Sequence, residues 1–404
     1  NTEDTVLLAM EYTDDFSFGS APGKFNNGVT GITCRVEIGV YSGSSLWDYT
    51  VTLKNNKDEF VKYEYWTCTT LSPGSDAADT GCPLNSEIVV STENYRADWS
   101  PGRWIGNYGA LYDFDGINYL SKWKDMGIAY AQDLQSNYWG VINHDNQEGI
   151  LRISENILTP GMKIWTWGRN EIDNNLYDFS NGGKDNYIEL WAGVSESFFA
   201  DATLSPLEKI GWLESYGPTV GLAAIHKINR YVAVNLGINS NGDALFYQLM
   251  SFFPEEEYAL SIYLDGDRLY SIVEKKLKGS KTGIEEQFSL ENIAAGNYNL
   301  HLDLHNSEGD LVMATEKEIS YQGTGIYQEA WPTDLIVQTL GNGSILIELP
   351  SEDVFDLEVF SVNGKLIRRA QASSSVDLQL PKKGLYILRV KTNSFVFSQK
   401  IVVQ

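Results

Sequence analysis

Cysteine and histidine are scarce in this chain of 404 residues, which has three cysteines and four histidines. No cysteine–histidine pair has zinc-site spacing, so we expect no structural zinc. Cys68 and Cys82 flank a loop rich in Gly, Pro and Asp, whereas Cys34 lies apart. In an oxidising compartment a Cys68–Cys82 disulfide would close this loop and stabilise the fold by about 3 kcal/mol. Two free buried thiols are an alternative that the sequence leaves open.

Positive charge is also in short supply. Lysine and arginine number 30 against 54 aspartates and glutamates, which gives a formal net charge of −24. Nucleic acid and anionic membrane surfaces repel such a polyanion, so neither is expected as a partner. No apolar run approaches the roughly 20 residues of a membrane-spanning helix, so we expect no direct membrane insertion. Residues 1–5 lack the charged and then apolar pattern of a signal peptide. We therefore expect Asn1 to be a processed start, a truncation or the first ordered residue.

Helical periodicity of useful length is missing from residues 1–218, where alternating strands and long loops stand instead. Residues 46–54, LWDYTVTLK, alternate as a half-buried strand should. Aromatic residues make up 12% of the chain and there are 36 glycines, a composition typical of β-rich proteins with long loops. The length suits about two or three domains. These features predict an all-β protein whose first domain is residues 1–218.

Residues 219–322 differ in texture from the first segment. Tryptophan disappears, and strands such as residues 231–238, YVAVNLGI, recur with turn sequences between them. A strand about every 8–12 residues is typical of an immunoglobulin-like β-sandwich. This segment is therefore predicted to be one such sandwich, followed by a linker at residues 323–332.

The tail, residues 333–404, is a series of short alternating strands separated by turns such as Asn363-Gly364-Lys365. Its segments VFSVNGKLI (359–367), LQLPKKGLYILRV (378–390) and KIVVQ (400–404) closely resemble the type A sorting domain of the Bacteroidetes type IX secretion system. The resemblance implies a small β-sandwich that directs export, through the periplasm, to the medium or the outer cell surface. It also implies that residues 333–404 bind the secretion machinery, its outer-membrane translocon and shuttle proteins. An ordinary terminal β-sandwich is the alternative. The residues expected to carry the signal are Gly364, Lys365, Gly384, Tyr386, Lys400 and Gln404.

A second resemblance covers about residues 30–218 and rests on motifs in a particular order. These are YWGVINHDNQEGILRI (138–153), PGMKIWTWGR (160–169), YIELWAG (187–193), LSPLEK (204–209) and WLESYGP (212–218). Together they resemble a largely uncharacterised bacterial domain family with the galactose-mutarotase-like β-supersandwich fold. Complete supersandwiches are longer than this stretch. We therefore expect the chain to begin inside the domain, with a natural half-domain as the alternative.

The supersandwich resemblance implies two candidate catalytic residues. In sugar mutarotases of this fold a glutamate removes the anomeric hydroxyl proton while a histidine protonates the ring oxygen. Glu189 matches that glutamate by position, although Leu207 replaces the glycine expected in the following turn. His144 is the only histidine of the segment, and its surroundings match the mutarotase histidine motifs poorly. A satisfied strand carboxylate and a polar turn histidine are the structural alternatives.

Aromatic residues near these two positions suggest sugar binding. Trp165 and Trp167 alternate onto one side of their strand together with Lys163 and Arg169. Indole rings pack against the CH faces of sugars, and arginine binds carboxylates, so such a group suits an acidic sugar. Core packing of the indoles is the alternative. The predicted substrate-binding residues are Trp139, Trp165, Trp167, Arg169 and Trp191.

Acidic loops raise the question of calcium, which takes oxygen ligands. The loops contain Asp113 with Asp115, Asp265 with Asp267, and Asp173 with two asparagines. None has the full EF-hand pattern, so plain turns are favoured and no cofactor is expected, with calcium binding as the alternative.

The sequence as a whole favours a secreted or cell-surface protein that binds a carbohydrate ligand. A poorly matched histidine and the lack of a clear acid/base pair count against the alternative of a carbohydrate-active enzyme, an epimerase, lyase or hydrolase using Glu189 and His144. A structural adhesin without a binding site is the third possibility.

Overall fold

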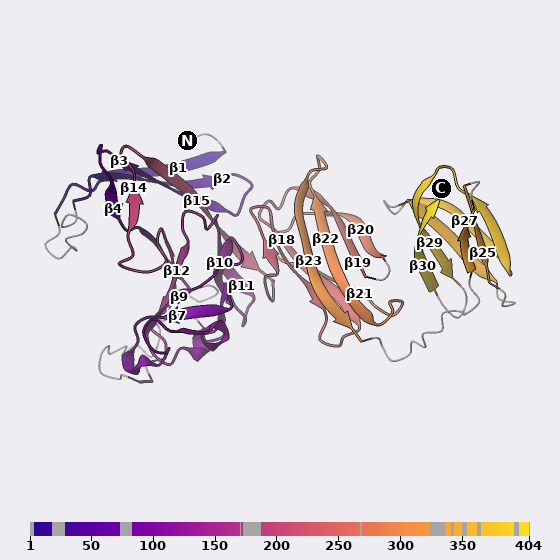
Figure 1. Cartoon of the computed structure of the whole chain (residues 1–404), viewed down its shortest axis with the longest axis horizontal. Coiled ribbons are helices and arrows are strands. Elements are labelled where there is room, and N and C mark those ends of the chain that lie inside the picture. Colours follow the sequence, from indigo (N-terminus) through magenta and orange to yellow (C-terminus); the bar gives the residue numbers. More distant parts are fainter. Residues whose placement is uncertain are drawn as a thin grey trace. The chain divides into compact units, whose positions relative to one another are not determined.

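The described part of this computed structural model consists of residues 4–17, 29–72, 83–169, 171–172, 187–266, 269–322, 336–340, 343–349, 354–361, 365–391 and 396–403. Across these residues the chain forms strands and no α-helix, so the predicted all-β class is confirmed (Figure 1). The only helical pieces among them are three 3₁₀ turns, η2 (Pro101–Arg103), η3 (Phe114–Gly116) and η4 (Leu120–Lys122). No helix in the described ranges is long and apolar enough to cross a membrane.

The first large sheet has seven antiparallel strands. Its edge strand, β1, exposes apolar side chains on both of its faces, among them Val6, Leu7, Leu8 and Met10. In spatial order the strands are β1 (Thr5–Thr13), β2 (Ile32–Tyr41), β3 (Trp47–Asn55), β15 (Lys209–Val220), β11 (Glu148–Ile153), β10 (Tyr138–Asn143) and β6 (Ser86–Val90).

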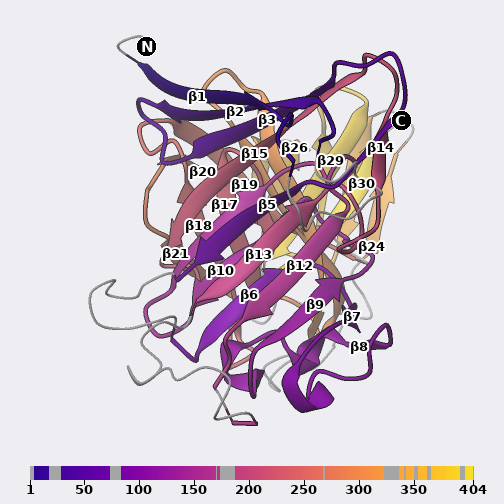
Figure 2. The ribbon, with the colours of Figure 1, turned by 90° about the vertical axis from the view of Figure 1, so that its left-hand side faces the viewer.

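The second large sheet has six strands, most of which lie side by side in Figure 2. In spatial order they are β5 (Trp66–Leu71), β13 (Ile188–Gly193), β12 (Gly161–Thr166), β9 (Gly127–Ala131), β7 (Asn94–Ala97) and β8 (Leu111–Asp113). A separate two-stranded ribbon pairs β14 (Ala202–Leu204) with β4 (Val61–Tyr63).

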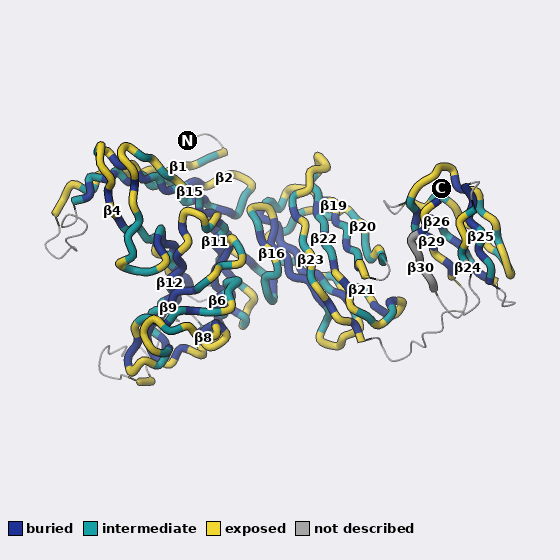
Figure 3. The backbone as a smooth tube through the Cα atoms, viewed as in Figure 1, coloured by how far each residue is buried: buried dark blue, intermediate teal, exposed yellow. Residues whose placement is uncertain are grey.

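The main core lies between the two large sheets. Ile88, Val141 and Trp139 from the seven-stranded sheet pack against residues of the six-stranded sheet such as Ile164 and Leu190. Burial is nearly continuous along β9 and β12 (Figure 3). A second cluster, which includes Val51, Leu53 and Trp212, joins the seven-stranded sheet to the β4–β14 ribbon. Successive side chains of a strand point to opposite faces of its sheet, so every second residue enters the sandwich even where both faces are covered.

Residues 227–321 form two four-stranded sheets. Along β19 and β22 buried and exposed residues alternate, the pattern of a sheet with one covered face. The first sheet has the order β16 (Lys227–Ile228), β17 (Val232–Ile238), β18 (Ala244–Ser251) and β21 (Ile284–Ser289). The second has the order β20 (Tyr270–Lys278), β19 (Glu257–Asp265), β22 (Gly296–His305) and β23 (Leu311–Tyr321). The immunoglobulin-like topology stays a prediction.

The tail folds into two further sheets around its own apolar core, in which Leu357, Val359 and Leu388 are fully buried. One sheet has the order β24 (Ile336–Thr339), β25 (Ser344–Glu348) and β28 (Ser375–Gln379). The other has the order β27 (Leu366–Ala372), β26 (Phe355–Ser361), β29 (Gly384–Lys391) and β30 (Val396–Val403). The short strands predicted for this tail are therefore present.

Four of the residues predicted to carry the sorting signal lie within the described part of the tail. The Tyr386 hydroxyl donates a hydrogen bond to the Lys382 carbonyl at 2.7 Å, next to Gly384 at the start of β29. Lys365 closes the hairpin that follows β26, and Lys400 pairs with Ile387 in β30. Gly364 and Gln404 lie outside the described residues.

The chain divides into two compact units that differ from its predicted domains. One unit consists of Asn1–Asn235, Gln248–Glu255 and Gly279–Ile284, and the other of Leu236–Tyr247, Glu256–Lys278 and Glu285–Gln404. The predicted boundaries at residues 218, 322 and 332 stay predictions.

Candidate functional site

The candidate site lies on the face of the six-stranded sheet that points away from the core. Ile164 and Leu190 turn into the core, so their neighbours on β12 and β13 turn to the other face. Trp165 stands opposite Glu189 in the antiparallel register, and Lys163 stands opposite Trp191. The register therefore brings these four residues together on one face of the sheet, as strand alternation predicts.

Glu189 is held by its neighbour two residues along the strand. The Trp191 Nε1–H donates a hydrogen bond to Glu189 Oε2 at 2.9 Å, and Lys163 Nζ lies 3.9 Å from the same oxygen. The Glu189 side chain keeps 17% of its surface exposed. Its carboxylate is therefore oriented by the protein and still accessible to a ligand.

Lys163 is a buried cation beneath aromatic rings. Its Nζ lies 3.5 Å from the centre of the Trp191 ring and 4.8 Å from that of Phe198, and the residue is only 4% exposed. Burial lowers the pKa of Lys163 from 10.5 to about 8, although the charge of Glu189 acts in the opposite direction. Cation–π contact and the nearby carboxylate offset part of the loss of hydration. The sequence predicted that Lys163 lies on this face. It did not predict the contact with Phe198, which comes from the loop after β13.

Three aromatic rings continue this face beyond Glu189. Trp165 and Trp167 meet edge to face with ring centres 4.4 Å apart, and Tyr187 lies 5.8 Å from Trp165 and 6.4 Å from Trp167. All three residues are half-buried, so each keeps some surface exposed. Arg169 is exposed and forms an ion pair with Glu171 at 2.8 Å. The Glu189 face, as we call this surface, consists of Lys163, Trp165, Trp167, Tyr187, Glu189 and Trp191.

His144 belongs to a different neighbourhood. It follows β10 of the seven-stranded sheet, and its Nε2 lies 2.7 Å from Glu87 Oε2 and 3.4 Å from the Tyr119 hydroxyl. Within the described residues no contact joins His144 to Glu189, which belongs to the six-stranded sheet. The structure therefore does not bring the two predicted catalytic residues together, and their shared role stays a prediction.

Trp139 lies in the core rather than at a surface. It is 1% exposed, and the Arg152 guanidinium stacks 4.0 Å from its ring centre. Its indole faces are covered by protein atoms, so it lacks the open surface that stacking on a sugar requires. The predicted substrate-binding role of Trp139 does not fit this burial.

A buried ion pair next to Trp139 was not anticipated from the sequence. Arg152 Nε donates to Glu214 Oε2 at 2.7 Å, and both side chains are almost completely buried between the large sheets. Glu214 also accepts hydrogen bonds from Thr67, Trp212 and Tyr216 at 2.8–2.9 Å. The alternation of Trp212, Glu214 and Tyr216 along β15 is the sequence feature that could have indicated that Glu214 shares a face with two aromatic residues.

The remaining candidates concern metals and the disulfide. Asp113 caps the η3 turn, because its Oδ1 accepts a hydrogen bond from the Asp115 backbone N–H at 3.1 Å. The described parts of the chain hold no group of three or more His, Cys, Asp or Glu side chains arranged to bind a metal. Cys68 is exposed on β5, whereas its predicted partner Cys82 lies outside the described residues, as do Asp173 and Asp267. The disulfide stays a prediction.

Two known protein families match parts of the chain. Residues 18–219, half of the 404 residues, match the family described as Domain of unknown function (DUF5107). Residues 341–404 match the family described as Secretion system C-terminal sorting domain. The second match confirms the predicted sorting domain and indicates export by type IX secretion to the cell surface or the extracellular space.

Several solved structures resemble the chain. A TPR-domain containing protein from Parabacteroides distasonis is 16% identical with a TM-score of 0.43, and the match covers 56% of this chain and 35% of that one. Galactose mutarotase-like proteins from Lactobacillus casei and Clostridium acetobutylicum are 10% and 9% identical, with TM-scores of 0.36 and 0.37. These two matches cover 54% and 55% of this chain, and 71% and 64% of those proteins. Such scores are too low for an activity to be transferred from these proteins to this chain.

Proposed function

The chain belongs to the DUF5107 family, and from this membership together with its sorting domain we propose that it is a type IX secretion cargo that binds carbohydrate outside the cell. The observation that carries the proposal is the Glu189 face, where an oriented and accessible carboxylate stands between two groups of aromatic rings. Its ligand would be a glycan at the cell surface or in the surrounding medium.

The chemistry of the face suits a sugar. Sugar CH groups pack on indole and phenol rings, and Trp165, Trp167 and Tyr187 offer half-exposed ring surface for such contacts. A carboxylate accepts hydrogen bonds from sugar hydroxyls, and those bonds are stronger than neutral ones. Because Trp191 fixes Glu189 Oε2, the acceptor is preorganised before the ligand arrives.

Binding has more support than catalysis. Ring opening of a sugar requires a general acid and a general base on opposite sides of the anomeric centre. Glu189 and His144 have separate partners in separate sheets. Their separate partners are the reason why we favour binding over the epimerase alternative.

A glycan array tests the proposal directly. We expect the full chain to bind a subset of glycans, and Glu189→Gln and Trp165→Ala each to weaken that binding about tenfold or more. Glu93→Gln and Phe60→Ala change an exposed carboxylate and an exposed ring elsewhere in the domain, and serve as matched controls. Thermal melts of all four variants show whether they remain folded. Failure to bind any glycan, or equal binding by both site variants and their controls, would sink the proposal.

The export half of the proposal has its own test. We propose residues 333–404 as the sorting domain that the secretion machinery recognises. In a bacterium with a type IX system, deletion of these residues should leave the protein in the periplasm. A Tyr386→Ala variant, which loses the hydrogen bond to Lys382, should reduce export partly. Undiminished export of the deleted chain would contradict the assignment.

A further inference from the structure

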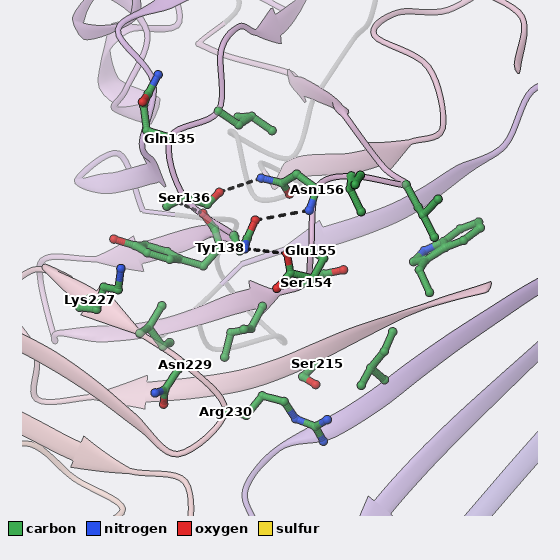
Figure 4. Close-up of a pocket in the computed structure, with 18 of the residues that line it drawn as sticks. Gln135, Ser136, Tyr138, Ser154, Glu155, Asn156, Ser215, Lys227, Asn229 and Arg230 are labelled. Atoms are coloured by element: carbon green, nitrogen blue, oxygen red, sulfur yellow. Dashed lines mark hydrogen bonds between the residues drawn. The ribbon is translucent and has the colours of Figure 1, made fainter. Parts of the chain in front are cut away.

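We propose that the chain has a second binding site, separate from the Glu189 face, which takes a short oligosaccharide containing a uronic acid. The site is a pocket of about 880 Å³ (Figure 4). It lies on the face of the seven-stranded sheet opposite to the buried Glu214. Ile153 and Ser215 line it, whereas their strand neighbours Arg152 and Glu214 point into the sandwich. We call it the outer pocket. Its volume is in the usual range for small-ligand sites.

Hydrogen bonds fix the two segments that form one wall of the outer pocket. The Asn137 side-chain amide donates to Glu155 Oε2 at 2.9 Å, and the Ser154 backbone N–H donates to the Asn137 carbonyl at 2.9 Å. The Asn156 amide donates to the Ser136 carbonyl at 2.8 Å. These bonds link residues 136–137, before β10, to residues 154–156, after β11. The wall is thus built before any ligand arrives.

The opposite wall comes from residues 227–230, which are anchored to the same sheet. Ile228 is buried in a cluster with Leu151 and Phe252. Arg230 Nη2 donates to both carboxylate oxygens of Asp48, at 2.8 and 3.2 Å. Figure 4 shows Arg230 on a different segment from Ser154 and Asn156, across the space between them.

Two polar atoms of the pocket lining have no hydrogen-bond partner. Ser154 Oγ is buried in a residue that is 6% exposed, and Asn156 Oδ1 is buried as well. An unpaired buried polar atom destabilises a protein by roughly 1–3 kcal/mol, so a ligand group that pairs with it gains binding free energy. The amide oxygen needs a donor, and the serine hydroxyl can donate or accept. Ligand hydroxyl groups satisfy both requirements.

The charges around the pocket point to an acidic sugar. Lys227 and Arg230 line it and are exposed, in a chain with a formal net charge of −24. Glu155 is the one carboxylate among its lining residues, and Asn137 already hydrogen-bonds to it. Asp48 already pairs with Arg230, so Lys227 is the lining cation that we assign to a ligand carboxylate, beside the atoms that would bind the ligand hydroxyls. Tyr138 adds aromatic lining.

Titration calorimetry with the full chain tests this site. The probes are trisaccharides of galacturonic and glucuronic acid, each compared with the neutral trisaccharide of the same linkage. We expect tighter binding of the acidic probes. Ser154→Ala should weaken binding of acidic and neutral probes about fivefold, the effect of one hydrogen bond. Lys227→Gln should weaken only the acidic probes, whereas Lys54→Gln, an exposed lysine on β3, should change nothing.

The test of the outer pocket can succeed or fail independently of the test of the Glu189 face. Glu189→Gln should leave binding in the outer pocket unchanged, even if the glycan array finds no ligand for the Glu189 face. Ser154→Ala removes a hydroxyl that has no protein partner, so the variant should fold normally. The inference fails if the acidic probes do not bind, if Ser154→Ala binds like wild type, or if Lys54→Gln and Lys227→Gln have equal effects.

Discussion

Two glutamates of this protein have similar neighbours in the sequence but differ in their exposure to solvent. Glu189 lies in Tyr187-Ile-Glu-Leu-Trp191 and Glu214 in Trp212-Leu-Glu-Ser-Tyr216. In both, a tryptophan two residues away donates its indole N–H to the carboxylate, at 2.9 Å for Glu189 and 2.8 Å for Glu214. Glu189 keeps an exposed surface, whereas Glu214 is sealed between the sheets with Arg152.

Strand alternation identifies which residues share a face of a sheet, but it does not show what covers that face. Each glutamate shares its face with aromatic rings, as period-two alternation requires. β15 turns that face towards β5, whose Thr67 completes the shell of Glu214. β13 turns it away from the core. One pattern therefore gives a structural ion pair in one sheet and an accessible carboxylate in the other.

The largest expected effect comes from the buried glutamate. Glu214→Gln keeps the shape of the side chain but leaves the Arg152 charge uncompensated, so we expect the free energy of unfolding to fall by about 3 kcal/mol. Urea denaturation measures this difference. Glu189→Gln is the matched control, with an expected loss below about 1 kcal/mol because its carboxylate is partly hydrated. Equal losses for the two variants would erase the distinction between them.

Lys163 gives an effect of intermediate size that depends on pH. Because its pKa is about 8 in the folded protein and 10.5 when unperturbed, the unfolded chain holds a proton between these values that the folded chain has released. The free energy of unfolding of the wild type should therefore rise, relative to Lys163→Met, as the pH increases from about 8 to 10.5. Denaturation of both proteins at several pH values across this window checks the sign. A difference that stays constant would mean that Lys163 is hydrated and keeps an ordinary pKa.

The smallest effect is expected at the edge of the Glu189 face. Arg169 and Glu171 form an exposed ion pair, in contrast to the buried pair of Arg152 and Glu214. Exposed pairs contribute little because water screens them, so Arg169→Gln should change stability by less than about 0.5 kcal/mol. A thermal melt close to that of the wild type is the expected result, and a large drop would show that Arg169 supports more than its ion pair.

Much of this arrangement could be predicted from sequence because it depends on local alternation. The strand expected at residues 46–54 is β3 (Trp47–Asn55), and the strands of the tail are where turn sequences had delimited them. The sharing of one face by Glu189 and Trp191 follows from the same rule. The pairing of Trp165 with Glu189 required the register between two strands, which the sequence alone does not provide.

Long-range partners explain what could not be predicted. Glu87 approaches His144 from a strand 57 positions earlier, and Arg152 reaches Glu214 across 62 positions. Trp139 is buried because Arg152 and the opposite sheet cover it, and nothing in its own segment encodes that cover. The outer pocket forms where residues 136–156 and 227–230 come together in the fold. These segments are far apart in the sequence, so no local motif predicts the pocket.

The edge strand β1 has a consequence for how the protein behaves in solution. Val6, Leu8 and Met10 expose between 56% and 66% of their surface to water on a strand at the margin of its sheet. Apolar strands in that position favour self-association, which grows with protein concentration. Concentrated samples should therefore scatter light well before dilute ones do, and Leu8→Lys should restore solubility without touching either binding surface.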